Sequence, residues 1–307
     1  MSASTPLLRF TRGARPRPSP GAVLIALMAI AGLVVVMYPA IASWFSARAQ
    51  SSTVAAYANE IASTPSEVLT DTLAQAQEYN AAIPEILLTD PYTLDDAMSG
   101  RGGAYETYEE QLRLASDTRE SPPMARIRIP TIDVNLPVYH GTEDMVLERG
   151  AGHLFGSSLP VGGEGTHSVI TAHAGLVEAT MFDHLVDVAE GDEILIDVMG
   201  EQLTYRVTGS ETVLPTEVSS LRLEPGEDLL TLVTCTPIGV NSHRLLVHAE
   251  RVAVPQESAE PSTTQLSDGT GGPGFPWWAV QLAGGVALIL AVVTLAERAG
   301  GRRRPTS

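Results

Sequence analysis

The sequence predicts a mostly β domain that is held between two membrane-spanning helices. Three observations support this fold class. Short β-type runs separated by Gly and Pro turns fill residues 124–253, helical patterns fill residues 46–123, and uncharged apolar segments occupy residues 21–45 and 275–296. Several short strands at this spacing are typical of a sandwich or a small closed barrel.

Each apolar segment is long enough to cross a bilayer as a helix. A hydrocarbon core of about 30 Å requires about 20 helical residues, and residues 21–45 and 275–296 exceed that length without a charge. The second segment contains Trp277 and Trp278 near its start, an aromatic pair typical of the membrane interface. Both segments are therefore predicted to be transmembrane helices.

Basic tails orient these helices. Residues 1–20 and 297–307 place arginines next to the two apolar segments, namely Arg9, Arg12, Arg15, Arg17, Arg298, Arg302, Arg303 and Arg304. By the positive-inside rule both tails are cytoplasmic. The region between the helices is therefore predicted to lie outside the cell membrane.

The first apolar segment is compatible with two fates. Its length favours a retained anchor, because signal-peptide cores are shorter, about 7–15 residues. However, Ala47-Arg48-Ala49 has the small-x-small form of a signal-peptidase site, so cleavage after Ala49 is the alternative. The second helix anchors the protein in either case.

The exported region is strongly acidic. The chain has a formal net charge of −17 although both tails are basic. Such a surface repels nucleic acid and suits basic partners or a cell-wall matrix. Acidity also serves simply to keep an extracellular domain soluble, so charge alone does not identify a partner.

Residues 46–123 are predicted to form a helical arm. Residues 64–67 read TPSE, which resembles a helix start with a Thr cap, Pro at the first helical position and Glu completing a capping box. A helix over 65–81 would end before Pro84, and a shorter helical pattern lies around 105–114. The apolar positions on one face of the longer helix are Val68, Leu69, Leu73 and Ala76.

The β region contains a series of short predicted strands. They cover residues 125–129, 134–139, 168–173, 193–198, 203–214, 229–235 and 243–252. About 130 residues can bury a sufficient core without disulfides. Residues 254–274, rich in Pro, Ser, Thr and Gly, are predicted to be a flexible linker to the second membrane helix.

Cys235 is the only cysteine of the chain and lies at the end of an apolar strand pattern. It cannot form an internal disulfide, so packing or reactivity must explain it. A free Cys on such a strand is often merely packed. A reactive one needs a nearby cation or base. Arg244 on the next predicted strand would return beside Cys235 through a turn at residues 237–241.

His173 is the candidate proton carrier. Acyl transfer requires an acid for the leaving amine and a base for the incoming nucleophile, and the pKa of imidazole suits both steps. His173 follows the strand pattern of residues 169–171, so it is predicted to lie at the rim of the β domain. Taken singly, His173 and Arg244 would be ordinary turn and strand residues. The histidines lack metal-ligand spacing, and no cofactor or metal is predicted.

These elements together resemble the sortases, the membrane-anchored cysteine transpeptidases of Gram-positive bacteria. Residues 231–235 read TLVTC, matching the family's TLxTC strand motif. Arg244 stands at the family's arginine, and residues 171–175, TAHAG, stand at its histidine turn. The Ala before His173 replaces the Gly of many relatives. The resemblance covers about residues 124–252 and implies a closed sortase-type β-barrel.

The subclass indicated is class C, the pilin-polymerising sortases. Two membrane helices, a helical arm, LPVYHG at residues 136–141 and Asp90-Pro91-Tyr92 carry this resemblance. In that class an Asp-Pro-aromatic element forms a lid over the active site. The resemblance implies that Asp90 lies against Arg244 and Tyr92 over Cys235. On sequence alone, these three residues would more simply be a turn.

The resemblance also implies a two-step acyl transfer at an LPxTG-type sorting signal. Cys235 attacks between Thr and Gly, Arg244 stabilises the oxyanion or holds the substrate, and His173 serves as acid and then base. Thr234 is a weaker candidate for oxyanion or substrate support. The thioester is passed to a lysine amine of a pilin subunit, and because all 19 Lys or Arg residues here are arginines, no side chain of the enzyme competes.

Two alternatives remain open at this stage. A housekeeping sortase would use a peptidoglycan-precursor amine and anchor single surface proteins to the cell wall. A catalytically silent, membrane-tethered scaffold would bind wall proteins and tolerate replacement of Cys235. The resting state of the lid and the ionisation of Cys235 and His173 are likewise not predicted, because a thiolate–imidazolium pair and a neutral pair are both compatible with these residues.

Overall fold

The structure is a computed structural model that forms two compact units. It describes residues 19–83, 90–92, 102–114, 117–119, 121–252 and 272–301. One unit combines Met1–Pro39 with Pro276–Ser307, and the other is Ala40–Phe275. Most of the predicted linker and of the basic tails lies outside the described residues.

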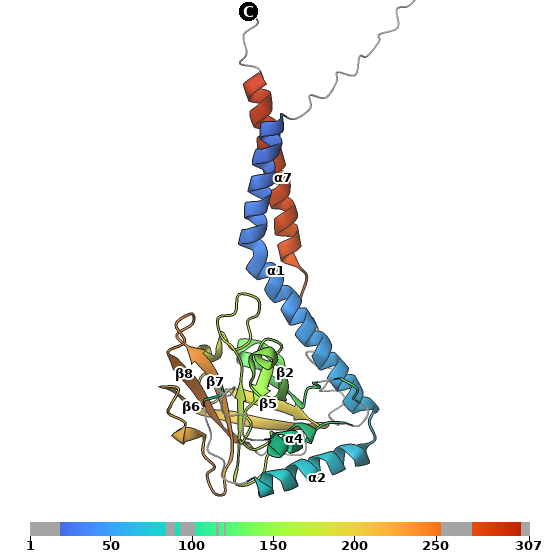
Figure 1. Cartoon of the computed structure of the whole chain (residues 1–307), viewed down its shortest axis with the longest axis vertical. Helices are drawn as coiled ribbons and strands as arrows, with labels where there is room; N and C mark the ends of the chain where they lie inside the picture. The colour runs from blue at the N-terminus through green and yellow to red at the C-terminus, as the bar shows by residue number, and fades with distance from the viewer. Residues whose placement is uncertain are drawn as a thin grey trace, which may run out of the picture. The chain divides into compact units, whose positions relative to one another are not determined.

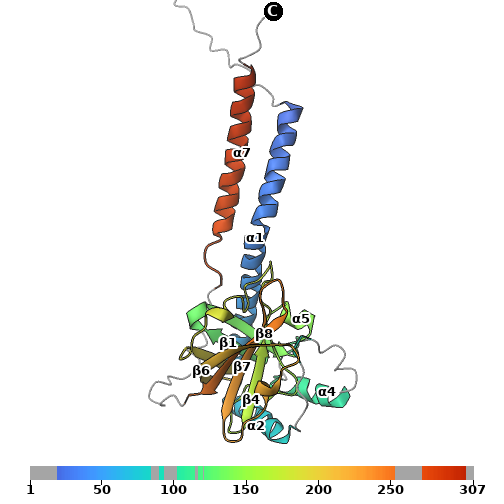
Figure 2. The ribbon, with the colours of Figure 1, turned by 90° about the vertical axis from the view of Figure 1, so that its left-hand side faces the viewer.

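The first unit contains helical segments that are long and apolar enough to cross a membrane. Helix α1 covers Pro20–Ser63 and α7 covers Trp277–Gly301. The N-terminal part of α1 runs beside α7 (Figures 1 and 2). A side chain at Gly285 would place its Cβ 2.6 Å from Leu33 Cδ2, so this glycine permits the close approach. α1 also continues beyond residue 45, so the first apolar segment and the start of the arm are one helix.

Eight described strands close into a barrel in the order β1-β2-β3-β4-β7-β8-β6-β5 (Figure 1). Their bounds are β1 Ala125–Ile129, β2 Val134–His140, β3 Ala151–His153, β4 Thr166–Thr171, β5 Glu193–Val198, β6 Glu201–Val213, β7 Asp228–Thr236 and β8 His243–Arg251. The β2–β3 and β4–β7 pairs are parallel and the others antiparallel. The predicted closed barrel is confirmed, but the three-residue β3 was not predicted.

Successive side chains along a strand point to opposite faces, so apolar side chains of β1 and β5 form the core while polar ones lie on the outside, where these two strands pair. Ile127 and Ile196 are fully buried in the main apolar cluster. At the β1–β5 seam that closes the barrel, the guanidinium of Arg128 donates two hydrogen bonds of 2.9 Å to the carboxylate of Asp197. This two-point pairing adds a charged connection to the backbone ladder.

Helix α2 (Ser66–Ala82) confirms the predicted helix but not its predicted cap. Pro65 occupies the N-cap position and makes no side-chain cap. Because α1 extends to Ser63, the Thr64 hydroxyl instead donates to Glu60 O at 2.8 Å. Leu73 and Ala76 are buried as expected, whereas Val68 is exposed. Pro84 lies outside the described residues.

Side chains from the arm make specific contacts with the barrel unit. Asn80 on α2 donates to Leu159 O at 3.1 Å and accepts from Leu159 N at 2.8 Å. Tyr57, on the C-terminal part of α1, donates to Met124 O at 3.3 Å and accepts from Met199 N at 3.1 Å. These bonds satisfy buried backbone groups, so the arm is an integral part of the barrel unit.

Helix α4 (Gly102–Glu110) docks through one fully buried tyrosine, Tyr108. Its hydroxyl lies 2.9 Å from both Nδ1 and the carbonyl oxygen of His153. The His140 ring packs against the ring of Tyr108 at a centroid distance of 4.9 Å. Burial lowers the pKa of His140 to about 3 and that of His153 to about 4, so both imidazoles are neutral in the folded protein.

These two histidines predict acid sensitivity of the arm–barrel contact. Their pKa values in the folded protein lie below the ordinary 6.5, so folding favours the neutral form of both rings. The contribution of the two neutral rings to the free energy of unfolding is therefore complete above pH 6.5 and is lost as pH falls toward 4. We expect each to lower the free energy of unfolding by about 2 kcal/mol at pH 5 relative to pH 7. His140→Gln, which keeps a donor, should make this pH dependence shallower.

Urea unfolding of the full chain in detergent micelles, followed by near-ultraviolet circular dichroism at both pH values, measures the effect. His184→Gln is the matched control, because His184 is exposed. Equal pH dependence in wild type and His140→Gln would contradict the prediction.

Candidate active site

The β7–β8 hairpin places Cys235 directly opposite Arg244. Because side chains alternate along a strand, Cys235 shares the outer face of β7 with Val233, whereas Leu232 faces the barrel core. Cys235 is 7% exposed and Arg244 8% exposed. The predicted return of the arginine through residues 237–241 is therefore confirmed.

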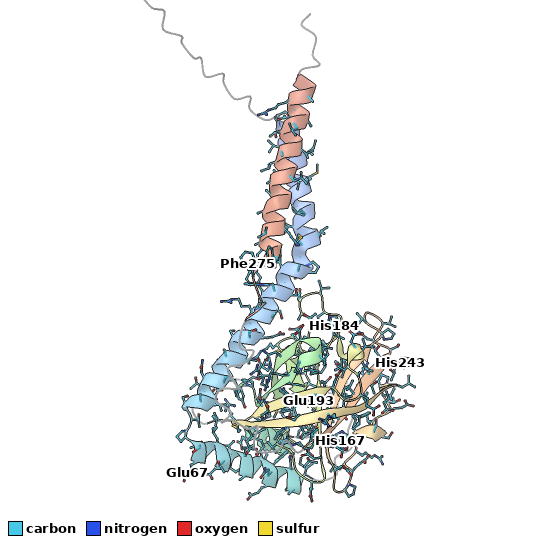
Figure 3. All side chains as sticks on the ribbon, turned by 180° about the vertical axis from the view of Figure 1, so that it is seen from behind. Glu67, His167, His184, Glu193, His243 and Phe275 are labelled. Carbon is cyan, nitrogen blue, oxygen red and sulfur yellow. The ribbon has the colours of Figure 1, made fainter. Side chains whose placement is uncertain are left out.

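The parallel β4–β7 pairing brings His173 to the same place. Thr171 pairs with Val233, and Ala172 N donates to Val233 O at 3.3 Å. Two residues beyond this pair, the two chains reach His173 and Cys235. The loops after β4 and β7 leave the barrel at one end, where His184 and His243 are labelled in Figure 3.

Short contacts fix the loop that carries His173. Its carbonyl oxygen accepts from Phe182 N at 3.0 Å, and Gly175 N donates to Asp183 Oδ1 at 2.6 Å. Thr234 donates from its hydroxyl to Ala172 O at 2.8 Å. Thr234, which the sequence suggested for oxyanion or substrate support, therefore binds the backbone of Ala172, the residue before His173.

Asp90 binds Arg244 with both carboxylate oxygens. Arg244 Nε donates to Oδ1 at 2.8 Å and Nη2 donates to Oδ2 at 2.7 Å. Nη1 donates to the carbonyl oxygens of Asn241 and His243 at 3.1 and 3.2 Å. All three guanidinium nitrogens are therefore engaged, and Asp90 occupies the two that do not bind the hairpin backbone.

Tyr92 is the neighbour shared by the three candidate residues. The Arg244 guanidinium lies 4.8 Å from the centre of its ring, and the His173 ring centre lies 5.7 Å away. The Tyr92 hydroxyl donates to Ala172 O at 2.8 Å and is near enough to Cys235 to influence the thiol. Its ring also packs on a second apolar cluster, formed by Leu154, Val169, Leu221, Val233 and Leu246.

The environment of Cys235 favours the neutral thiol. Burial raises the pKa of Cys235, and the negative charge of Asp90 raises it further. The positive charge of Arg244 and a hydrogen bond from Tyr92 lower it, but the net direction is upward. With Asp90 in place, the cation beside the thiol is already paired.

The environment of His173 favours the neutral imidazole. Burial lowers the pKa of His173, while the charges of Asp144 and Glu148 oppose this effect. Both carboxylates lie on or next to the short helix α5 (Asp144–Leu147). The raised pKa of Cys235 and the lowered pKa of His173 together favour a neutral thiol and a neutral imidazole, rather than an ion pair, when residues 90–92 lie over the site.

Several contacts in the site were not predicted from the sequence. The Ala172 carbonyl accepts from both Tyr92 and Thr234, which joins three segments at one oxygen. Thr171 Oγ1 lies 2.9 Å from Tyr92 Oη, and its position within TAHAG was the available signal. Thr142 donates to Pro91 O at 2.7 Å, and no pattern in the sequence marked it. Among the described residues, no group of three His, Cys, Asp or Glu side chains could hold a metal ion.

Comparison with known proteins defines the class. Residues 127–252 match the sortase domain family. Sortase C-1 from Actinomyces oris is 46% identical, with a TM-score of 0.56 over 61% of this chain and 99% of that one. This protein belongs to the sortase family, which comprises cysteine transpeptidases.

Further relatives extend across sortase types. Sortase A from Corynebacterium diphtheriae is 43% identical over 71% of this chain and 96% of its own, with a TM-score of 0.59. A lid mutant of that sortase is 45% identical over 62% and 97%, with a TM-score of 0.55. Sortase A from Streptococcus agalactiae is 29% identical over 46% of this chain and 58% of its own length. The chain spans about three fifths of the first curated relatives that it matches.

The contact between Asp90 and Arg244 predicts how the thiol titrates. We expect Asp90→Asn to lower the pKa of Cys235, because a charge that disfavours the thiolate is removed and Arg244 is released toward the sulfur. The pH dependence of iodoacetamide alkylation, read by intact mass spectrometry, gives this value. In wild type its midpoint should lie above 9.0, the ordinary value for the thiol.

Asp71→Asn on the exposed side of α2 is the control, since it removes the same charge from a residue that is not among those influencing the thiol. An unchanged midpoint in Asp90→Asn would show that Asp90 does not influence the thiol.

Proposed function

We propose that this protein is a membrane-tethered cysteine transpeptidase that joins pilin subunits outside the cell. The observation that carries the proposal is the pairing of Cys235 with Arg244, with His173 at the end of the neighbouring parallel strand. Similarity to a pilus-related sortase C of Group B Streptococcus, 36% identical over 95% of that chain, supports the pilin substrate. A sorting signal of the LPxTG type is the proposed donor.

In the first step, Cys235 attacks the carbonyl carbon of the Thr in the signal while its thiol proton passes to His173. Arg244 stabilises the negative charge that develops on the carbonyl oxygen. His173 then gives the proton to the departing Gly amine, the Thr–Gly bond breaks, and a thioester remains on Cys235. Neutral starting forms of the thiol and imidazole fit this order, because the proton moves as the carbon–sulfur bond forms.

In the second step, a lysine amine of another pilin attacks the thioester. His173 takes a proton from the attacking amine and returns it to the departing sulfur. A new amide bond forms and the Cys235 thiol is restored. The absence of lysine from this chain means that its own side chains do not compete as acceptors.

Residues 90–92 act as the lid in this proposal. Asp90 occupies two guanidinium donors of Arg244 that the substrate carbonyl would use. Tyr92 covers the second apolar cluster, on which the Leu and Pro of a sorting signal could pack. Substrate binding therefore requires displacement of both side chains.

The topology follows from the same proposal. Residues 124–253 form the catalytic domain outside the membrane, and residues 46–123 form its arm. Residues 21–45 and 275–296 serve as anchors, with both termini in the cytoplasm. The arginine-rich tails and the two apolar helical segments support this arrangement.

An LPxTG peptide tests the acyl-transfer step. We expect intact mass spectrometry of the full chain in detergent micelles to find an adduct of the peptide cleaved after Thr. Cys235→Ala should form none. Asp90→Ala/Tyr92→Ala should form it about tenfold faster, the ratio that corresponds to about 1.4 kcal/mol of lid stabilisation.

The acceptor is tested on the adduct once it has formed. A pilin fragment with an accessible lysine should release it faster than a peptidoglycan-type amine at the same concentration. The reverse preference would replace pilin assembly by surface-protein anchoring. No adduct in either lid state, with several signals tried, would overturn the enzymatic proposal in favour of a binding scaffold.

A further inference from the structure

The last residue of β2 and the loop that follows it contact both the lid and the segment of helix α4. His140 Nε2 donates to Gln111 O at 2.9 Å, just beyond α4, since a carbonyl can only accept. Gly141 N donates to the Tyr108 hydroxyl at 3.1 Å. Thr142 donates to Pro91 O at 2.7 Å. Glu143 accepts from the Tyr105 hydroxyl at 2.9 Å. Residues 140–143 are called the clasp below.

On the lid side of the clasp there is a buried hydrogen bond. Thr142 is 3% exposed, and its hydroxyl reaches the carbonyl between Asp90 and Tyr92. Pro91 stands between Asp90 and Tyr92 in the chain, and these are the two side chains that cover the site. A donor fixed there sets the positions of Asp90 and Tyr92 together.

The arm side of the clasp is rigid. Tyr105 and Tyr108 lie three residues apart on one face of α4, and their ring centres are 5.5 Å apart. Phe155 packs on both rings, at 5.2 and 5.1 Å. Gly141 has a φ of +79°, and a Cβ there would overlap the Glu143 carboxylate and lie 2.6 Å from the Tyr105 hydroxyl. Only glycine fits this approach of the loop to α4.

We propose that the clasp couples the docking of α4 to the closure of the lid, with Thr142 as the positioning residue. When Tyr105 and Tyr108 are seated, the clasp presents the Thr142 hydroxyl to Pro91 O and the lid stays closed. When α4 leaves the barrel, this donor is no longer held in place and the lid is released. The proposal rests on the assignment of residues 90–92 as a lid, but not on the identity of the substrate.

Alkylation of Cys235 tests the coupling without turnover, because it is the only thiol of the chain. In the full chain in detergent micelles, Thr142→Val should raise the iodoacetamide alkylation rate about three- to tenfold, as expected for loss of one buried hydrogen bond. Thr142→Ser keeps the hydroxyl and should restore the wild-type rate. Tyr108→Phe removes the α4 hydroxyl that contacts Gly141 and His153 but leaves the bond from Thr142 to Pro91 in place, and it should also accelerate alkylation.

Two further variants separate the explanations. Thr166→Val removes a similar hydroxyl that donates to Gly163 O at 2.7 Å near the start of β4, and should leave the rate unchanged. Asp90→Ala reports the rate with the lid released, provided that all rates are compared at a pH above the alkylation midpoint, where a change in the pKa of Cys235 does not alter them. If Asp90→Ala accelerates alkylation while Thr142→Val and Tyr108→Phe react at the wild-type rate, the proposed coupling through the clasp is wrong. The assignment of residues 90–92 as a lid would then still stand. Wild-type rates in all variants, including Asp90→Ala, would overturn both.

Discussion

The buried pairing of Asp90 with Arg244 is the interaction on which the state of the active site depends. It joins residues 154 positions apart in the chain and uses two of the three guanidinium nitrogens. A charged pair removed from water stabilises a structure only when its geometry is good and its remaining donors are bonded. Here the hairpin carbonyls satisfy the third nitrogen, so Arg244 is fully engaged while the site is covered. Burial is the main cause of the raised pKa of Cys235, and the charge of Asp90 in this pairing adds to it.

The rigid and removable parts of the site come from different elements. Cys235 and Arg244 are fixed by ladder pairing within a closed barrel, which leaves little freedom for their backbones. The loop that carries His173 is fixed by the hydrogen bond from Phe182 N and by the bond from Thr234 to Ala172 O. Asp90 and Tyr92 are held by side-chain contacts to the barrel and by one bond from Thr142. A displaced lid can therefore leave the catalytic geometry intact. In the proposed function, the protein thus combines a preorganised site with a lid, residues 90–92, that a peptide substrate displaces.

Much of this could be predicted from the sequence, and the remainder has physical reasons. The long strands show clear apolar alternation, and the TLVTC strand with a following arginine is specific enough to identify the site. The three-residue β3 is too short to produce a period, and the Thr64 cap was wrong because α1 continues to Ser63. The lid came from family resemblance, since an Asp-Pro-Tyr run is usually a turn. The bond between Thr142 and Pro91 has no sequence signature, because a hydroxyl can meet any carbonyl that the fold brings near.

A single cysteine beneath a cover also has consequences for redox chemistry. The thiolate is the form that oxidants attack, and a buried neutral thiol reacts slowly. No second cysteine exists to trap a sulfenic acid as an internal disulfide, so its repair would depend on a thiol from another molecule. The contacts that hold Asp90 and Tyr92 near Cys235 therefore also shield its sulfur from peroxide. Under the proposed function, each opening of the lid for a peptide exposes the sulfur to damage that this chain cannot reverse by itself.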